Sequence, residues 1–122
     1  MPGLRVLVVE DELIIAMELE SLLRGLGCIV LDAVPAIGHA LRALARERAN
    51  FAVLDVNLRG ERVTPVAEEL QKQGVPFVLV TGYGSERLHE EALRDAVCLH
   101  KPVDGPRLAS AMVEVLTRRE RG

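Results

Sequence analysis

Short apolar runs alternate with longer amphipathic segments along the whole chain of 122 residues. The runs are only a few residues long and rich in Val, Leu and Ile, which is typical of strands buried inside a parallel sheet. Most of them lead directly into polar residues at their carboxyl ends. The predicted strands span residues 4–9, 28–31, 51–57, 77–80 and 96 to 99 or 100.

The segments between the runs repeat apolar residues at the spacing of one helical face. Two of them show the pattern most fully: Ile15, Leu19, Leu22, Leu23 and Leu26 before Gly27, and Leu108, Ala111, Met112, Val115 and Leu116 after Asp104. Glycine favours the end of a helix and aspartate its start, so these flanking residues mark boundaries. Further helices are predicted to open at Pro35 and at Thr64–Pro65, the second ending at Gly74. A weaker pattern predicts a helix over residues 85–94.

Five predicted strands that alternate with five predicted helices indicate an α/β fold. Right-handed crossovers then place helices on both faces of a parallel sheet. The expected architecture is a doubly wound, flavodoxin-like five-stranded sheet with strand order 2-1-3-4-5. We expect a single domain over residues 4–119, with short tails at 1–3 and 120–122.

Composition narrows the possible functions. Apolar residues make up 49% of the chain and charged residues 27%, which is typical of a globular domain. The net charge of −3 and the scarcity of aromatic residues disfavour direct nucleic-acid binding. No signal segment or membrane-spanning apolar run is present, so we expect a cytoplasmic protein. Cys28 and Cys98 lack neighbouring cysteines at metal-ligand spacing and are interpreted as small buried hydrophobes.

Polar side chains with complementary chemistry follow four of the predicted strands. They are Glu10 and Asp11 after the first strand, Asp55 in the third, Thr81 after the fourth and Lys101 after the fifth. In a parallel sheet all carboxyl ends lie at one edge, with neighbouring strands about 4.8 Å apart. These side chains should therefore converge where the winding of the sheet reverses direction, the usual ligand position in such folds.

The converging groups favour phosphoryl transfer to a carboxylate. Neighbouring carboxylates repel one another unless a cation lies between them. Oxygen ligands without thiols suit a hard divalent ion, Mg²⁺ before Ca²⁺ or Mn²⁺. Asp55 would act as the nucleophile, while Lys101 and the Thr81 hydroxyl would stabilise the oxygens of the transferred group.

Each residue also has a simpler interpretation. Asp55 could be an ordinary polar residue at a strand end, and residues 10–12 could favour the N-terminus of the next helix. Thr81 could belong to a turn, and Lys101 could be a solvated surface charge. The joint occurrence of these residue types at four strand ends favours the functional interpretation.

Four motifs identify a resemblance that extends over the whole chain. They are VLVVEDE at 6–12, VLDVNL at 53–58, LVTGYG at 79–84 and HKP at 100–102. The sequence resembles the receiver domain of bacterial two-component response regulators, a (βα)5 fold. The resemblance implies a role for each matching position: Asp55 as phosphoacceptor, Asp11 as direct Mg²⁺ ligand, Glu10 as ligand through a water, Asn57 as carbonyl ligand, Thr81 as the mobile hydroxyl and Lys101 as charge partner. It also implies a cis peptide between Lys101 and Pro102.

The chain departs from the common receiver pattern near its switch residues. Receivers commonly carry Tyr or Phe three residues before the lysine, and Cys98 occupies that position here. PFVLVTGYG at 76–84 resembles the stand-alone FAT-GUY subgroup, although Leu79–Val80 replaces its Phe-Ala. Tyr83 either takes over part of the signalling role or only packs the loop.

The leading hypothesis is a single-domain response regulator rather than an enzyme. It would accept a phosphoryl group on Asp55 from a histidine kinase or phosphotransfer protein, with Mg²⁺, and signal to an unknown protein partner or relay the group. The Thr81–Cys98 region is expected to change conformation. A phosphate sink without an output partner is an alternative.

Two enzyme or cofactor-binding alternatives fit the sequence less well. An aspartyl-phosphate hydrolase would carry an acid where Asn57 stands, and its nucleophile usually follows the first strand. A nucleotide-binding domain would carry G-x-G-x-x-G after the first strand, where this chain has acids.

Overall fold

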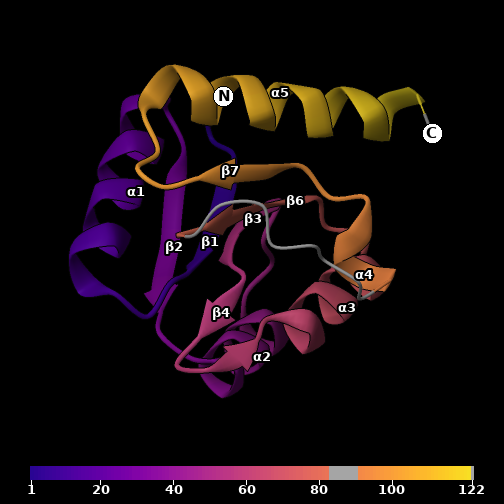
Figure 1. Ribbon diagram of the computed structural model, residues 1–122. Coiled ribbons are helices and arrows are strands. Elements are labelled where there is room, and N and C mark those ends of the chain that lie inside the picture. The colour runs from indigo at the N-terminus through magenta and orange to yellow at the C-terminus, as the bar shows by residue number, and fades with distance from the viewer. Residues whose placement is uncertain (83–90, 122) are drawn as a thin grey trace.

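The computed structural model describes residues 1–82 and 91–121 and contains a five-stranded parallel sheet (Figure 1). Its strands are β1 (Arg5–Val9), β2 (Ile29–Val34), β3 (Phe51–Asp55), β6 (Phe77–Thr81) and β7 (Cys98–His100). They are arranged in the order β2-β1-β3-β6-β7. This arrangement confirms the predicted 2-1-3-4-5 order of a doubly wound, flavodoxin-like fold.

Helices cover both faces of the sheet. They are α1 (Leu13–Gly25), α2 (Ile37–Arg46), α3 (Thr64–Gln73), α4 (Glu91–Arg94) and α5 (Gly105–Arg121). Figure 1 shows α1 and α5 on one face and α2 and α3 on the other. No helix in the described residues is both long enough and apolar enough to cross a membrane.

The sheet separates two apolar clusters because successive side chains of a strand point to opposite faces. Phe51 and Val53 of β3 pack in the cluster with residues of α1 and α5. Ala52 and Leu54 of the same strand pack in the cluster with residues of α2 and α3. All four are completely buried, which explains why the strand reads as a continuous apolar run.

Two predicted helix boundaries are confirmed by their capping geometry. Gly74 ends α3 in the left-handed conformation (φ 72°), which glycine adopts without a steric penalty. Asp104 precedes α5, and its Oδ1 accepts a hydrogen bond from the Arg107 N–H at 2.8 Å. Both caps satisfy backbone groups that a helix terminus would otherwise leave unpaired.

Several other predicted boundaries are wrong by a few residues. The second strand continues through Asp32 to Val34, because it is an edge strand with an irregular register that tolerates an exposed polar residue. Pro35 therefore precedes α2 instead of opening it, and Ala36 is the N-cap. Thr64 is the first residue of α3 rather than its N-cap, which is Val63.

A small hairpin replaces the loop expected after the third strand. It consists of β4 (Asn57–Leu58) and β5 (Glu61–Arg62), which pair in antiparallel fashion. Arg59 and Gly60 form the turn with φ of 51° and 85°, the left-handed backbone that two-residue hairpins favour. Of the predicted helix at 85–94, the described part is α4, while residues 83–90, including Tyr83, lie outside the described residues.

Candidate functional site

Three carboxylates meet at the carboxyl edge of the sheet. Glu10 directly follows β1, and Asp55 is the last residue of β3. Together with Asp11, each offers an oxygen within 4.8 Å of the others. The chain folds this way because β1 and β3 are neighbours in the sheet, so their carboxyl ends lie side by side. The predicted convergence of these acids is confirmed.

In the described part of the chain, Lys101 is the cation that faces this cluster. Its Nζ lies 3.0 Å from Glu10 Oε1, 3.4 Å from Asp55 Oδ2 and 3.8 Å from Glu12 Oε1. The backbone holds it in place because its N–H donates to the carbonyl of Thr81 at 2.9 Å. The peptide that follows, to Pro102, is cis, as the resemblance implied.

Each carboxylate of the cluster also accepts a hydrogen bond from a nearby backbone N–H. Asn57 donates to Asp55 Oδ1 at 3.3 Å, and Glu12 donates to Glu10 Oε2 at 3.1 Å. The Arg59 N–H, at the hairpin turn, donates to Asp11 Oδ2 at 3.2 Å. These bonds orient the acids and leave other oxygen lone pairs available to a cation.

Burial and like charge shift the pKa values at the site. Burial and the neighbouring Glu10 raise the pKa of Asp55 to about 7, although Lys101 and the Asn57 N–H oppose the shift. Burial would lower the pKa of Lys101, but Glu10, Asp55 and Glu12 outweigh it and raise that pKa. Burial likewise opposes the backbone and side-chain hydrogen bonds that lower the pKa of Asp11.

The remaining predicted residues lie around this cluster. Thr81 is buried at the end of β6 and pairs in register with His100 of β7. Asn57 is exposed at the start of β4. Cys98 occupies β7 and is half-buried, and burial raises the pKa of its thiol, as expected of a small apolar side chain. Cys28 is buried and its pKa is also raised by burial.

Two contacts of the site were missed from the sequence. The hydrogen bond from Arg59 to Asp11 depends on a left-handed turn that arginine rarely adopts, so residue type alone did not signal it. Glu12 was interpreted only as part of an acidic run at a helix start, yet it faces Lys101. Its position two residues after Glu10 was the sequence feature that could have indicated a contact with Lys101.

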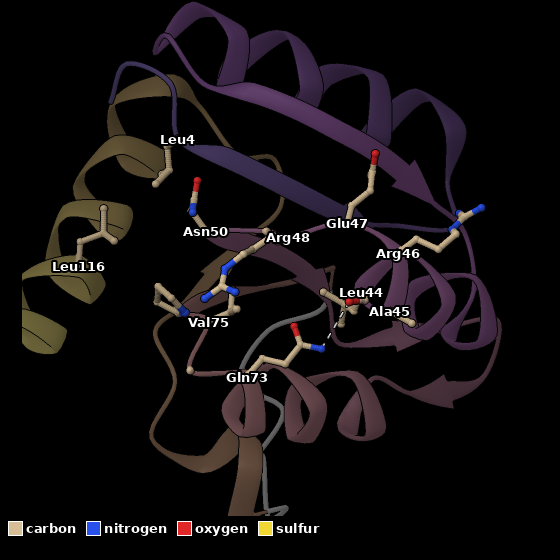
Figure 2. A pocket seen from close by; sticks show the side chains of 13 residues that line it. Leu4, Leu44, Ala45, Arg46, Glu47, Arg48, Asn50, Gln73, Val75 and Leu116 are labelled. Atoms are coloured by element: carbon tan, nitrogen blue, oxygen red, sulfur yellow. Dashed lines mark hydrogen bonds between the residues drawn. The ribbon is translucent and has the colours of Figure 1, made fainter.

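A second feature, a shallow hollow of about 680 Å³, lies at the opposite, amino edge of the sheet. Figure 2 shows Leu4 and Leu116 on one side and Gln73 on another, with Arg48 reaching toward Val75. This hollow contains no member of the acidic cluster. It is therefore separate from the candidate site.

The chemistry of the acidic cluster fits a hard divalent cation. Its candidate ligands are all carboxylate oxygens, and Glu10 and Asp55 are only 2% and 6% exposed. Buried carboxylates this close repel one another, and a small cation between them removes the repulsion. The Glu10, Asp11 and Asp55 arrangement is typical of the Mg²⁺ site of receiver domains.

The fold and site define a phosphoacceptor signalling domain. The family model described as response regulator receiver domain matches residues 6–113, so the chain belongs to that family. Members of the family are phosphorylatable domains of two-component signalling rather than conventional enzymes.

Among individual proteins, the chain is similar to SdrG from Sphingomonas melonis Fr1. The two sequences are 39% identical and the structures superpose with a TM-score of 0.82. The aligned region covers 93% of this chain and 97% of that one. A BeF3-activated conformation of SdrG from Pseudomonas melonis Fr1 has a TM-score of 0.79 at 39% identity, covering 95% and 99% of the two chains. Phyllosphere-induced regulator PhyR of Methylorubrum extorquens AM1 is 27% identical over 114 residues, which are 91% of this chain and 43% of PhyR. The chain thus spans less than half the length of this relative.

Proposed function

We propose that this receiver domain accepts a phosphoryl group on Asp55 from a histidine kinase or a phosphotransfer protein, with Mg²⁺ bound to the acidic cluster. The observation that carries the proposal is the position of Asp55. Its carboxylate lies at the carboxyl end of the central strand, among the cation-binding oxygens and 3.4 Å from Lys101 Nζ. The likeness to a protein solved in a BeF3-activated conformation supports it.

The side chains divide the chemistry among them. A carboxylate oxygen of Asp55 attacks the phosphorus, the new P–O bond forms, and the imidazole of the donor leaves with the electron pair of the P–N bond. Lys101 and the Thr81 hydroxyl stabilise the charge on the phosphoryl oxygens. Mg²⁺, when bound, neutralises further charge there. Asp11 and Asp55 would hold it directly, Glu10 through a water and Asn57 through its carbonyl.

Magnesium should stabilise the domain through this cluster. At a Mg²⁺ concentration ten times its dissociation constant, the free energy of unfolding should rise by about 1.4 kcal/mol. Asp11→Asn should remove most of this gain, because it deletes a ligand charge. Thermal unfolding with Mg²⁺ or EDTA measures the effect, and Asp32→Asn, an exposed change on β2, is the control. An unchanged Mg²⁺ response in Asp11→Asn would contradict the metal assignment.

The donor protein should dock beside the site, on the first turns of α1. Leu13, Ile14 and Met17 are 74%, 72% and 58% exposed there, an unusual display of apolar side chains next to an acidic cluster. A separate apolar hollow of about 220 Å³ lies between other residues of α1, among them Ile15 and Leu22, and Lys101. A protein whose phosphohistidine reaches Asp55 would lie over the first turns of α1 and contact these exposed side chains.

Met17→Glu should therefore reduce phosphotransfer from a histidine kinase at least tenfold, because it places a charge in the docking surface. Phosphorylation by acetyl phosphate, which needs no protein docking, should stay within about twofold of wild type. Val113→Glu on α5, where Val113 is 53% exposed, is the matched control. Equal losses with both donors would show damage to the site instead of docking.

The downstream role is proposed as that of a stand-alone receiver of the FAT-GUY type. Support comes from the PFVLVTGYG motif and from the likeness to SdrG over nearly the full length of both chains. Phosphorylation would change the Thr81–Cys98 region and create a surface for a protein partner. Partner capture with and without fluoroberyllate separates this role from a phosphate sink, which captures nothing in either state.

The decisive test is phosphotransfer profiling of the host's histidine kinases against the purified protein. At least one kinase should label it within a short incubation. No label from any kinase would contradict the proposal. Turnover of a generic phosphate ester would instead support the aspartyl-phosphate hydrolase, which the amide at Asn57 disfavours.

A further inference from the structure

Among the described residues, Lys101 has one carboxylate partner outside the proposed cation site. Glu10 and Asp55 belong to the group of oxygens that can hold a metal, whereas Glu12 does not. Glu12 is also the partner most free to move, since its side chain is 64% exposed and those of Glu10 and Asp55 are almost fully buried. Its 3.8 Å distance to Lys101 Nζ is the longest of the three ion pairs and exceeds hydrogen-bonding range.

We infer that Lys101 exchanges Glu12 for the phosphoryl group, and that the release of Glu12 signals phosphorylation to the N-terminus of α1. The inference rests on the proposed phosphorylation of Asp55. Phosphorylation replaces the single charge of the Asp55 carboxylate with about two negative charges, and it brings three acceptor oxygens within reach of Lys101. The long, exposed contact to Glu12 is the weakest of the three ion pairs that Lys101 makes with described residues, so it breaks first.

The position of Glu12 allows its release from Lys101 to affect the N-terminus of α1. It is the N-cap residue of α1, its carbonyl accepts the Ala16 N–H at 2.9 Å, and its side chain makes no capping hydrogen bond. The first N–H groups of a helix attract negative charge. A carboxylate released from Lys101 therefore turns toward these N–H groups and stabilises the first turn of α1.

The surface that changes is the exposed apolar one. Leu13 and Ile14 follow Glu12 directly, and Met17 lies one helical turn further on. This route does not require an aromatic residue at position 98, where the chain carries Cys98. The phosphorylated and unphosphorylated forms thus present α1 differently, and a donor that docks there can distinguish them.

The test is NMR of wild type, Glu12→Gln and Glu18→Gln, each titrated with fluoroberyllate and Mg²⁺. Glu18→Gln removes the same charge from an exposed residue of α1 that has no ion pair with Lys101 among the described contacts. In wild type and in Glu18→Gln, methyl signals of Leu13, Ile14 and Met17 should shift on titration. In Glu12→Gln these shifts should be lost, while shifts at Gly82 and Lys101 remain.

Affinity gives an independent readout. Because Lys101 no longer has to leave Glu12, Glu12→Gln should bind fluoroberyllate about two- to fivefold more tightly than wild type, and more tightly than Glu18→Gln. Methyl shifts that persist in Glu12→Gln, or an affinity gain equal in both variants, would overturn the inference and leave the proposed function standing. A wild type with no shifts even at Gly82 and Lys101 would overturn both.

Discussion

Asp55→Asn should abolish phosphorylation, with label from kinase or acetyl phosphate at least a hundredfold below wild type. The amide nitrogen and the neutral amide oxygen cannot replace the carboxylate nucleophile, although the side chain keeps nearly the same shape. The fold should remain intact, because the Lys101 ion pair with Glu10 at 3.0 Å persists. The measurement is labelling at matched protein concentration, and Asp32→Asn is the control. If Asp55→Asn is labelled nearly as strongly as wild type, a residue other than Asp55 is the phosphoacceptor.

The same variant should be more stable than wild type in Mg²⁺-free buffer at pH 8. The pKa of Asp55 is raised to about 7 in the folded protein, whereas in the unfolded chain the carboxyl has its ordinary pKa of 3.8. Between these values the folded state holds a proton that the unfolded state has released, so the free energy of unfolding falls as pH rises from 4 to 7. Asp55→Asn removes this dependence. Solvent near the acidic cluster screens part of this effect. The free energy of unfolding of Asp55→Asn at pH 8 should therefore exceed that of wild type by about 1 to 2 kcal/mol.

Chemical denaturation at pH 5 and pH 8 in EDTA checks this expectation. The difference between variant and wild type should grow with pH and shrink again when Mg²⁺ is added, because a cation offsets the repulsion that Glu10 exerts on Asp55. A variant that is less stable than wild type at pH 8 would show that Asp55 contributes a favourable contact that outweighs its burial.

The fold was predictable because its information is local and repeated. Each face of the sheet is built from alternate residues of continuous apolar runs, as Phe51 to Leu54 show, and such runs signal parallel strands without tertiary information. Errors arose where an edge relaxes that rule. At β2 an exposed Asp32 and an irregular register made a strand interior look like a strand end.

The site was predictable to the level of which strands contribute side chains. Parallel topology alone brings Glu10, Asp55 and Lys101 to one edge, so their meeting follows from the strand order. The contacts made by backbone groups were not predictable in this way. The N–H of Arg59 reaches Asp11 only because a two-residue turn adopts left-handed φ, and this depends on the pairing of β4 with β5.

Lys101→Met should destabilise the Mg²⁺-free protein at pH 8 by about 2 to 4 kcal/mol, because removing one partner of a buried ion pair leaves the other charge uncompensated. Glu10, 2% exposed, and Asp55 would then face each other without the cation that lies 3.0 and 3.4 Å away in wild type. The methionine side chain is unbranched and only one heavy atom shorter than that of lysine, so lost packing contributes little.

The loss in Lys101→Met should have two signatures that a packing defect lacks. It should be smaller at pH 5, where Asp55 is protonated because its pKa is about 7, and smaller again in saturating Mg²⁺, which supplies positive charge to the same oxygens. Arg24→Met is the matched control, since it breaks an ion pair of similar length, 3.2 Å to Glu20, at an exposed site and should cost less than about 0.5 kcal/mol. Equal losses in both variants, or a loss that does not depend on pH and Mg²⁺, would mean that Lys101 does not balance the charge of the acidic cluster. If the expected pattern holds, the Mg²⁺-free domain is least stable under conditions in which the carboxylates of the acidic cluster are charged and lack a cation. The same repulsion between these carboxylates then favours the binding of the cation and of the phosphoryl donor.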